Sequence, residues 1–285
     1  MKKRISLFIF LCLLVFSCGA LAEDLRIGEA ARVANCQEYV TLRAWPETSA
    51  EPLARLPLGT EILYIAERND GFARVMADGQ TGFVLKAYLE KLPKEAREPY
   101  PLSEEARYNV GVFLSNFTKQ DFRAYDARYA PDSQLVEFAL WHMWDHHPER
   151  WESGSWGEWG EITKRLPAEA IDGVAERYLG REPASKESEY ILFQDGFYYM
   201  QEPGGPVGYG FASVSQIFDL GGGRYAVHFG AFGEGEEWEQ EDSKLYPEEA
   251  ACRFPLVHPG YAVIDMGEGF PEAAGNWSLE LLVID

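Results

Sequence analysis

The chain has 285 residues, of which 46% are hydrophobic and 14% aromatic, so it can fill the cores of two ordinary domains and is not a disordered chain. Its formal net charge of −20 makes nucleic acids and anionic membrane surfaces poor partners, because a strongly negative body repels phosphates. The charge is uneven: residues 23–92 contain 8 basic and 11 acidic side chains, whereas residues 93–285 carry a net charge of −20. This difference indicates two domains with different surfaces.

The first 22 residues have the three parts of a cleavable secretory signal peptide. Residues 2–4 are basic, and residues 7–16 are apolar without interruption. Within Ala-Leu-Ala at residues 20–22, Ala20 and Ala22 place small side chains at the two positions that a signal peptidase recognises. The apolar run is only about half as long as a bilayer span requires. We therefore expect export, cleavage after Ala22, and a secreted or surface-associated protein with no transmembrane segment.

A second cleavage site overlaps this signal. Residues 15–18 (Val-Phe-Ser-Cys) have the pattern of a bacterial lipobox, in which the chain is cut before the cysteine and Cys18 is acylated. Val15 stands where leucine is usual, and Phe16 is an unusual neighbour for the cut. The Ala-Leu-Ala site fits better, and a lipid anchor at Cys18 is the alternative.

Residues 31–92 consist of short β-patterned runs that are separated by turn residues. Residues 61–65, 72–75 and 81–84 are three of these runs, and the glycines at positions 71 and 79 mark turns between them. Several short strands in about 60 residues without an amphipathic helix are typical of a small all-β barrel. We expect such a barrel here.

The motifs of this segment resemble those of the bacterial SH3 domain. They follow one another in the family's order: YVTLRAWP, LPLGT, GFARV, GQTGFV and YL, at residues 39–46, 56–60, 71–75, 79–84 and 88–89. One departure is Thr41-Leu42-Arg43, where many members have Asn-Val-Arg, but the arginine is kept.

The resemblance implies an SH3-like ligand-binding module, often for peptidoglycan or for peptides at the cell surface, and no catalysis. A barrel of this size has little room inside, so a ligand must lie across its surface. Aromatic faces give affinity at low entropic cost. The candidate ligand-binding residues are therefore Tyr39, Arg43, Trp45, Phe72 and Tyr88, and the alternative for the aromatic ones is packing in the core or at its edge.

Residues 93–101 are rich in proline and predict a linker, and residues 102–285 predict an acidic α+β domain. Helices are expected from Ser103, which is a good N-cap, from Asp132 to before Pro148, and from Pro167 to Gly180. Strands are expected at 197–200, 208–220, 224–232, 261–264 and 277–283, with Gly221-Gly222-Gly223 as a hairpin turn.

The last of these strands alternates regularly, which predicts that Trp277, Leu279, Leu281 and Val283 share one face. Elsewhere in this domain, residues 113–117 (FLSNF) resemble a segment of uncharacterised secreted bacterial proteins that also carry bacterial SH3 domains. That resemblance is short and implies no activity.

Tryptophans are concentrated between residues 141 and 159. Those within the polar, glycine-containing stretch are Trp151, Trp156 and Trp159, and indole rings in a surface loop can stack on sugars. The alternative is a loop that folds back and buries these rings in the core. The acidic run at residues 234–242 lacks the ligand spacing of a calcium loop and is expected to be solvated.

Two histidines on the second expected helix, His142 and His146, are four residues apart and could face one metal ion. The glutamate that turns such a pair into a peptidase motif is missing, since Met143 follows His142. Packing and capping at the helix end is the favoured interpretation, and we expect no metal and no cofactor.

Two cysteines remain after signal removal, Cys36 and Cys252. In an oxidising compartment they could form a disulfide between the two domains. The favoured alternative is that each is a small buried apolar residue.

The sequence contains no Gly-x-Ser-x-Gly, no Walker loop and no Cys-x-x-Cys. We therefore expect an exported, non-catalytic binding protein whose SH3-like module contacts a cell-wall or extracellular peptide or glycan. The alternative is a secreted cell-wall hydrolase with acidic catalytic residues in the C-terminal domain and the barrel as its targeting module.

Overall fold

The structure is a computed structural model that describes residues 25–68, 70–93, 97–118, 122–156, 164–188, 191–201, 210–233, 240–267, 270 and 276–285. The expected signal peptide, both of its cleavage sites and Trp159 lie outside these residues. Within them, no helix is long and apolar enough to cross a membrane.

The first part of the chain folds into a seven-stranded antiparallel sheet with the order β3-β2-β6-β5-β4-β1-β7. Its strands are β1 (Ala30–Val33), β2 (Tyr39–Arg43), β3 (Pro52–Pro57), β4 (Glu61–Glu67), β5 (Phe72–Ala77), β6 (Gln80–Leu85) and β7 (Leu89–Lys91), and a 3-10 turn, η1 (Lys86–Tyr88), precedes β7. The expected antiparallel strands are therefore present, and all seven contribute to one hydrophobic core, with Leu42, Tyr64 and Val75 at its centre.

This sheet does not close into the expected barrel within the described residues. Closure would pair β3 with β7, but these strands are the two ends of the hydrogen-bonded order. The end strand β3 begins at Pro52 and ends at Pro57. Neither proline has the N–H that a further ladder would need, and prolines are tolerated at such an edge.

The second part of the chain combines helices with two further antiparallel sheets, as expected for an α+β domain. The helices are α2 (Glu104–Thr118), α3 (Asp132–His146), α4 (Ala168–Leu179) and α5 (Pro247–Ala250), with 3-10 turns η2 (Pro148–Arg150) and η3 (Gln240–Lys244). The larger sheet has the order β13 (Phe211–Gly221), β14 (Arg224–Phe232), β15 (Leu256–Asp265), β16 (Ser278–Ile284) and β8 (Ala124–Asp126). The smaller sheet has the order β11 (Leu192–Gln194), β12 (Phe197–Met200), β10 (Lys164–Pro167) and β9 (Glu152–Ser153).

The helix boundaries agree with the signals in the sequence. The Ser103 hydroxyl accepts a hydrogen bond from the Ala106 amide at 3.1 Å, which makes it the cap of α2. Helix α3 begins at Asp132 and ends before Pro148. Helix α4 ends at Gly180, which has a left-handed backbone with φ of 76°. The expected turn at residues 221–223 connects β13 to β14, and all three glycines have positive φ.

The expectation that Trp277, Leu279, Leu281 and Val283 share one face is wrong. The register between β15 and β16 shifts after Val263, so that Val263 pairs with Leu281 and Ile264 pairs with Leu279. The extra residue between these pairs is Glu280, a β-bulge that reverses the alternation of the strand. Leu279 therefore packs in the core beneath the helices, whereas Val283 is buried on the opposite face of the sheet.

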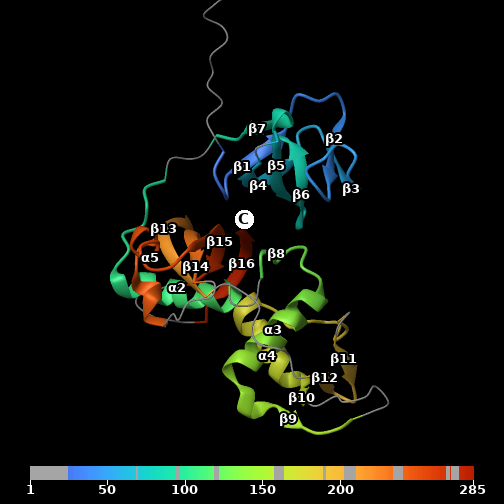
Figure 1. Ribbon diagram of the computed structural model, residues 1–285, viewed down its shortest axis with the longest axis vertical. Coiled ribbons are helices and arrows are strands. Elements are labelled where there is room, and N and C mark those ends of the chain that lie inside the picture. The colour runs from blue at the N-terminus through green and yellow to red at the C-terminus, as the bar shows by residue number, and fades with distance from the viewer. Residues whose placement is uncertain are drawn as a thin grey trace, which may run out of the picture.

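Both faces of the five-stranded sheet are covered. One face packs against α2, α3 and α4 around stacked rings such as Phe117 and Phe138, whose centroids are 4.7 Å apart. The other face packs against the first sheet, where Ile65 and Met76 bury Val283. Figure 1 shows the first sheet beside β8, β15 and β16, and the helices α2, α3 and α4 on the far side of these strands.

Polar contacts and close backbone approach accompany this apolar junction. The Arg74 guanidinium donates a hydrogen bond to the Ile284 carbonyl at 3.3 Å, and the Tyr129 hydroxyl lies 3.3 Å from Asp78 Oδ1. Gly28 has φ of +80°, and a Cβ atom at this position would lie 2.3 Å from the Tyr261 ring. Glycine is therefore required where the chain enters β1.

The junction predicts that Met76→Ala destabilises the protein by about 2 kcal/mol or more, since it leaves a cavity between the two sheets. Leu58→Ala is the matched control, because Leu58 is 53% exposed in the turn between β3 and β4 and its substitution should cost less than about 0.5 kcal/mol. Urea unfolding of both variants measures the difference. Equal effects of the two substitutions on the free energy of unfolding would contradict the burial of Met76 between the two sheets.

A second prediction concerns Tyr125, whose pKa burial raises from its usual 10.0 to about 12, with smaller opposing effects from Arg181 and Asp126. The folded state therefore holds the phenol proton more tightly than the unfolded state. This contribution to stability is complete below pH 10.0 and is lost as the pH rises towards about 12.

Tyr125→Phe should therefore lose less stability than the wild type across that window. Below it the variant should be about 1 kcal/mol less stable, because the Tyr125 hydroxyl no longer donates its 3.1 Å hydrogen bond to the Leu179 carbonyl. Urea unfolding on both sides of pH 10.0 measures this, with the exposed Tyr39→Phe as control. An unchanged pH dependence in Tyr125→Phe would contradict the prediction.

Candidate ligand-binding groove

A groove of about 740 Å³ runs across the first sheet beside β2. The residues that line it come from the β1–β2 loop, β2, the β2–β3 loop, the start of β5, the end of β6 and η1: Asn35, Cys36, Gln37, Glu38, Tyr39, Val40, Thr41, Arg43, Thr48, Phe72, Leu85 and Tyr88. Four of the five candidate residues of this domain are among them, although they are up to 49 positions apart in the sequence, from Tyr39 to Tyr88. The fold thus brings Tyr39, Arg43, Phe72 and Tyr88 to one place.

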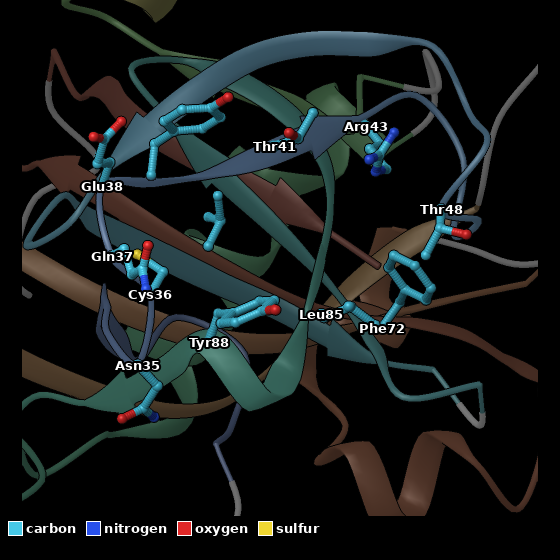
Figure 2. Close-up of a pocket in the computed structure, with 12 residues that line it drawn as sticks. Asn35, Cys36, Gln37, Glu38, Thr41, Arg43, Thr48, Phe72, Leu85 and Tyr88 are labelled. Atoms are coloured by element: carbon cyan, nitrogen blue, oxygen red, sulfur yellow. The ribbon is translucent and has the colours of Figure 1, made fainter.

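Figure 2 shows how these side chains are distributed along the groove. Asn35, Cys36 and Glu38 lie at one end, and Arg43, Thr48 and Phe72 lie at the other. Tyr88 lies between the two ends. The groove therefore has polar groups of different charge at its ends and an aromatic ring in the middle.

The alternation of β2 explains why its side chains reach the groove. Val40 and Leu42 are buried in the core of the first sheet. Successive side chains of a strand point to opposite faces, so Tyr39, Thr41 and Arg43 point outward together.

Backbone and side-chain hydrogen bonds fix both rims of the groove. The Ala34 amide donates to the Tyr88 carbonyl at 2.7 Å, and the Asn35 side-chain amide donates to the Ala87 carbonyl at 3.2 Å. At the other end, Arg43 Nη1 donates to the Ala50 carbonyl at 2.8 Å and holds the β2–β3 loop. The groove is therefore formed before any ligand arrives, which lowers the entropic cost of binding.

The three aromatic candidates in the groove differ in what they offer to a ligand. Tyr39 is 40% exposed, and the Arg55 guanidinium carbon lies 4.8 Å from its ring centroid. Tyr88 is half-buried and packs against the core of the first sheet. Phe72 is only 6% exposed, so it contributes mainly the apolar floor of the groove.

Trp45 lies apart from this arrangement. It is 69% exposed in the β2–β3 loop and does not line the groove. Sequence reasoning grouped it with the other aromatic residues because all of them belong to family motifs, but motif position alone does not tell which way a loop side chain points.

Sequence reasoning missed the polar side chains of the groove, which include Asn35, Gln37, Glu38, Thr41 and Thr48. Thr41 could have been found, since it alternates with Val40 and Leu42 on the same strand as two candidates. The loop residues gave no periodic signal, because their positions depend on how the β1–β2 loop folds back towards η1 and, for Thr48, on the β2–β3 loop.

The tryptophans of the second domain do not form a comparable site within the described residues. Trp151 is 6% exposed and packs edge-on against Trp144, with ring centroids 5.6 Å apart, as a ring that fills the core does. Trp156 is half-buried on the smaller sheet, 6.0 Å from the Tyr199 ring, and the Arg165 guanidinium carbon lies 4.6 Å from the Trp156 ring centroid. Trp151 therefore packs in the core, whereas Trp156 packs against Tyr199 and Arg165 of the smaller sheet.

The histidines of α3 are packed with aromatic rings. His142 is buried, and its ring centroid lies 4.5 Å from both His146 and Tyr178. Across the ranges that the structure describes, no three His, Cys, Asp or Glu side chains gather in a way that could hold a metal ion. The pair keeps its close spacing on one side of the helix, as its sequence positions predict.

Both cysteines are free thiols in the structure. Cys36 is half-buried in the wall of the groove. Cys252 is exposed after α5, and its thiol donates to the Glu248 carbonyl at 3.3 Å. The expectation of a buried apolar environment therefore does not describe Cys252.

Comparison with known proteins gives one informative result. No curated protein matches the chain. A solved structure of NlpC2 from Trichomonas vaginalis aligns over 82% of this chain and 72% of its own, with 12% sequence identity and a TM-score of 0.21, which supports no inference about fold or activity. Residues 38–90 match the family model of the bacterial SH3 domain, as the motifs of this segment predict. This part of the chain is therefore a bacterial SH3 domain.

Proposed function

We propose that this is an exported binding protein whose bacterial SH3 domain, residues 31–92, binds peptidoglycan or a related surface ligand in the groove beside β2. The observation that carries the proposal is the convergence of Tyr39, Arg43 and Tyr88 on one preformed groove. Bacterial SH3 domains commonly bind the cell wall, and the family match supports a role of this kind here.

The remainder of the proposal concerns organisation and location. Residues 93–101 connect the SH3 domain to an acidic α+β domain at residues 102–285. The signal peptide directs export, and cleavage after Ala22 releases the protein, whereas acylation at Cys18 would tether it. In either case the groove faces an extracellular ligand.

The charges of the groove favour the peptide part of such a ligand. Glu38 and Arg43 are five positions apart along an extended segment, which corresponds to roughly 17 Å. A carboxylate suits an ammonium group and a guanidinium suits a carboxylate. A short extended peptide that carries both groups can therefore lie along β2, with its middle against Tyr88.

Substitutions in the groove should weaken binding to purified, insoluble peptidoglycan in a sedimentation assay with the full-length mature protein. Tyr88→Leu keeps the contact with the core but removes the aromatic face, and Arg43→Gln removes the charge. Each should raise the Kd about tenfold, which corresponds to the loss of about 1.4 kcal/mol from the free energy of binding, as for a residue that carries much of the affinity of a site.

Trp45→Ala is the matched control, since this residue is 69% exposed, more than the other aromatic candidates of the SH3 domain, and lies outside the groove. Its affinity should stay within about a factor of two of the wild type. A loss with Trp45→Ala that exceeds the losses with Tyr88→Leu and Arg43→Gln would place the binding surface elsewhere and overturn the proposal.

Competition distinguishes the peptide from the glycan as the part that is bound. Soluble peptides released from the peptidoglycan should displace the protein from the insoluble polymer, whereas the glycan chains freed of peptide should not, because they lack the paired ammonium and carboxylate groups. Displacement by the glycan chains alone would contradict the proposal that Glu38 binds an ammonium group and Arg43 binds a carboxylate of the ligand.

A further inference from the structure

A cleft of about 430 Å³ lies between α3 and α4, which pack side by side (Figure 1). One wall comes from the end of α3 and from η2, with His142, Met143, His147 and Arg150. The other wall comes from α4 and extends from Pro167 at its start to Tyr178 in its last turn. At a rise of about 1.5 Å per residue, this wall is roughly 16 Å long. The cleft therefore suits an elongated molecule, and its volume lies within the range of about 300–1,000 Å³ that small-molecule sites occupy.

The two helices run in opposite directions, which determines where the arginines of the cleft lie. Arg181, just beyond the end of α4, forms an ion pair with Asp132 at the start of α3. At the other end, β9 follows η2 closely, β10 leads directly into α4, and these two strands pair with each other. Arg150 in η2 therefore lies near the start of α4, whereas Arg177 lies in the last turn of α4. The cleft thus has an arginine near each end.

The charges of these two arginines are not neutralised. Among the residues that the structure describes, neither Arg150 nor Arg177 forms an ion pair with a carboxylate. The Arg177 guanidinium carbon lies 5.2 Å from the centroid of the Tyr178 ring, a contact that leaves its charge in place. Within the described lining there is one carboxylate, Glu169, against two arginines. In a protein with a net charge of −20, this local excess of positive charge favours a ligand with acidic groups.

Between the two arginines the floor of the cleft is apolar. Met143 and Ala170 are buried, and Val174 is half-buried. Gly173 lies beside them in the interior of α4, where glycine is less favourable than alanine. Among the described residues, a Cβ atom at this position would meet nothing within 4 Å apart from its own helix, so packing does not require glycine here. The bare backbone instead leaves room for a ligand to lie directly on the helix.

We propose that this cleft binds an elongated aliphatic molecule that carries a carboxylate at each end. One carboxylate pairs with Arg150 and the other pairs with Arg177, since a guanidinium matches a carboxylate in shape and charge. Each end offers one arginine, which suits the single charge of a carboxylate better than the roughly two charges of a phosphate monoester. The chain between the carboxylates lies over Gly173 and against Val174. This site is separate from the groove beside β2 and does not depend on it.

The test compares three probes of equal chain length by isothermal titration calorimetry with the full-length mature protein. Suberate has a carboxylate at both ends, octanoate has one, and 1,8-octanediol has none. Suberate should bind one site at least about tenfold more tightly than octanoate, and octanoate should bind more tightly than the diol, because each charge-assisted pair adds to the affinity. A tenfold ratio corresponds to about 1.4 kcal/mol.

Substitution of each arginine locates the two ends of the ligand. Arg150→Gln and Arg177→Gln should each lower suberate affinity at least about tenfold, to that of octanoate, because one of the two carboxylates loses its partner. Arg68→Gln is the matched control, since Arg68 is an exposed arginine outside the cleft. Its suberate affinity should stay within about a factor of two of the wild type.

Substitution of the glycine tests the floor of the cleft. Gly173→Leu should lower suberate affinity at least about tenfold, because the new side chain occupies the open space above the helix. Glu176→Leu is the matched control, since Glu176 is exposed on the same helix and does not line the cleft. This variant should keep the suberate affinity of the wild type within about a factor of two.

Equal affinities of suberate and octanoate for the wild type would overturn the proposal. So would an unchanged suberate affinity in Arg150→Gln, in Arg177→Gln or in Gly173→Leu, and circular dichroism establishes that each variant is folded. Both arginine variants should keep their affinity for peptidoglycan, because neither residue lines the groove beside β2. Failure of either site therefore leaves the test of the other intact.

Discussion

The architecture depends on one irregularity in hydrogen bonding, the bulge at Glu280 between β15 and β16. Without it, Leu281 and Val283 would continue on the helical face with Leu279, and Leu282 and Ile284 would turn to the other face. With it, Val283 is buried against Ile65 and Met76, while Leu282 and Ile284 remain beneath the helices. A single extra residue thus decides which side chains of the last strand meet the SH3 domain and which pack beneath the helices.

The two hollows of the molecule have different origins. The groove beside β2 follows from strand alternation, which turns Tyr39 and Arg43 outward because Val40 and Leu42 point into the core. The cleft between α3 and α4 follows from the antiparallel packing of these helices and from the missing side chain at Gly173. One wall of the groove can be traced in the sequence of β2, whereas the cleft needs three segments, α3, η2 and α4, that meet only in the folded chain.

The sequence predicted the features that local rules determine: the SH3 motifs, the Ser103 cap, the ends of α3 and α4, and the α+β class of the second part of the chain. It did not predict β8, β9 and β10, which lie between the helices. Prediction from the sequence failed where contacts between residues far apart in the chain determine the structure. The bulge at Glu280 has no local signature, so alternation placed Leu281 and Val283 on the wrong face. The burial of Trp151 depends on its contact with Trp144, and the polar lining of the groove depends on a loop that no periodicity describes.

The prolines of β3 have a consequence for contacts between copies of this protein. An end strand with unpaired N–H and C=O groups is a template on which a second chain can extend the sheet, and this is a common route to aggregation. Pro52 and Pro57 remove donors at both ends of the strand and leave only a short stretch between them. The edge nearest the groove is thereby protected from strand addition, so that a high local concentration of the protein need not lead to fibril growth.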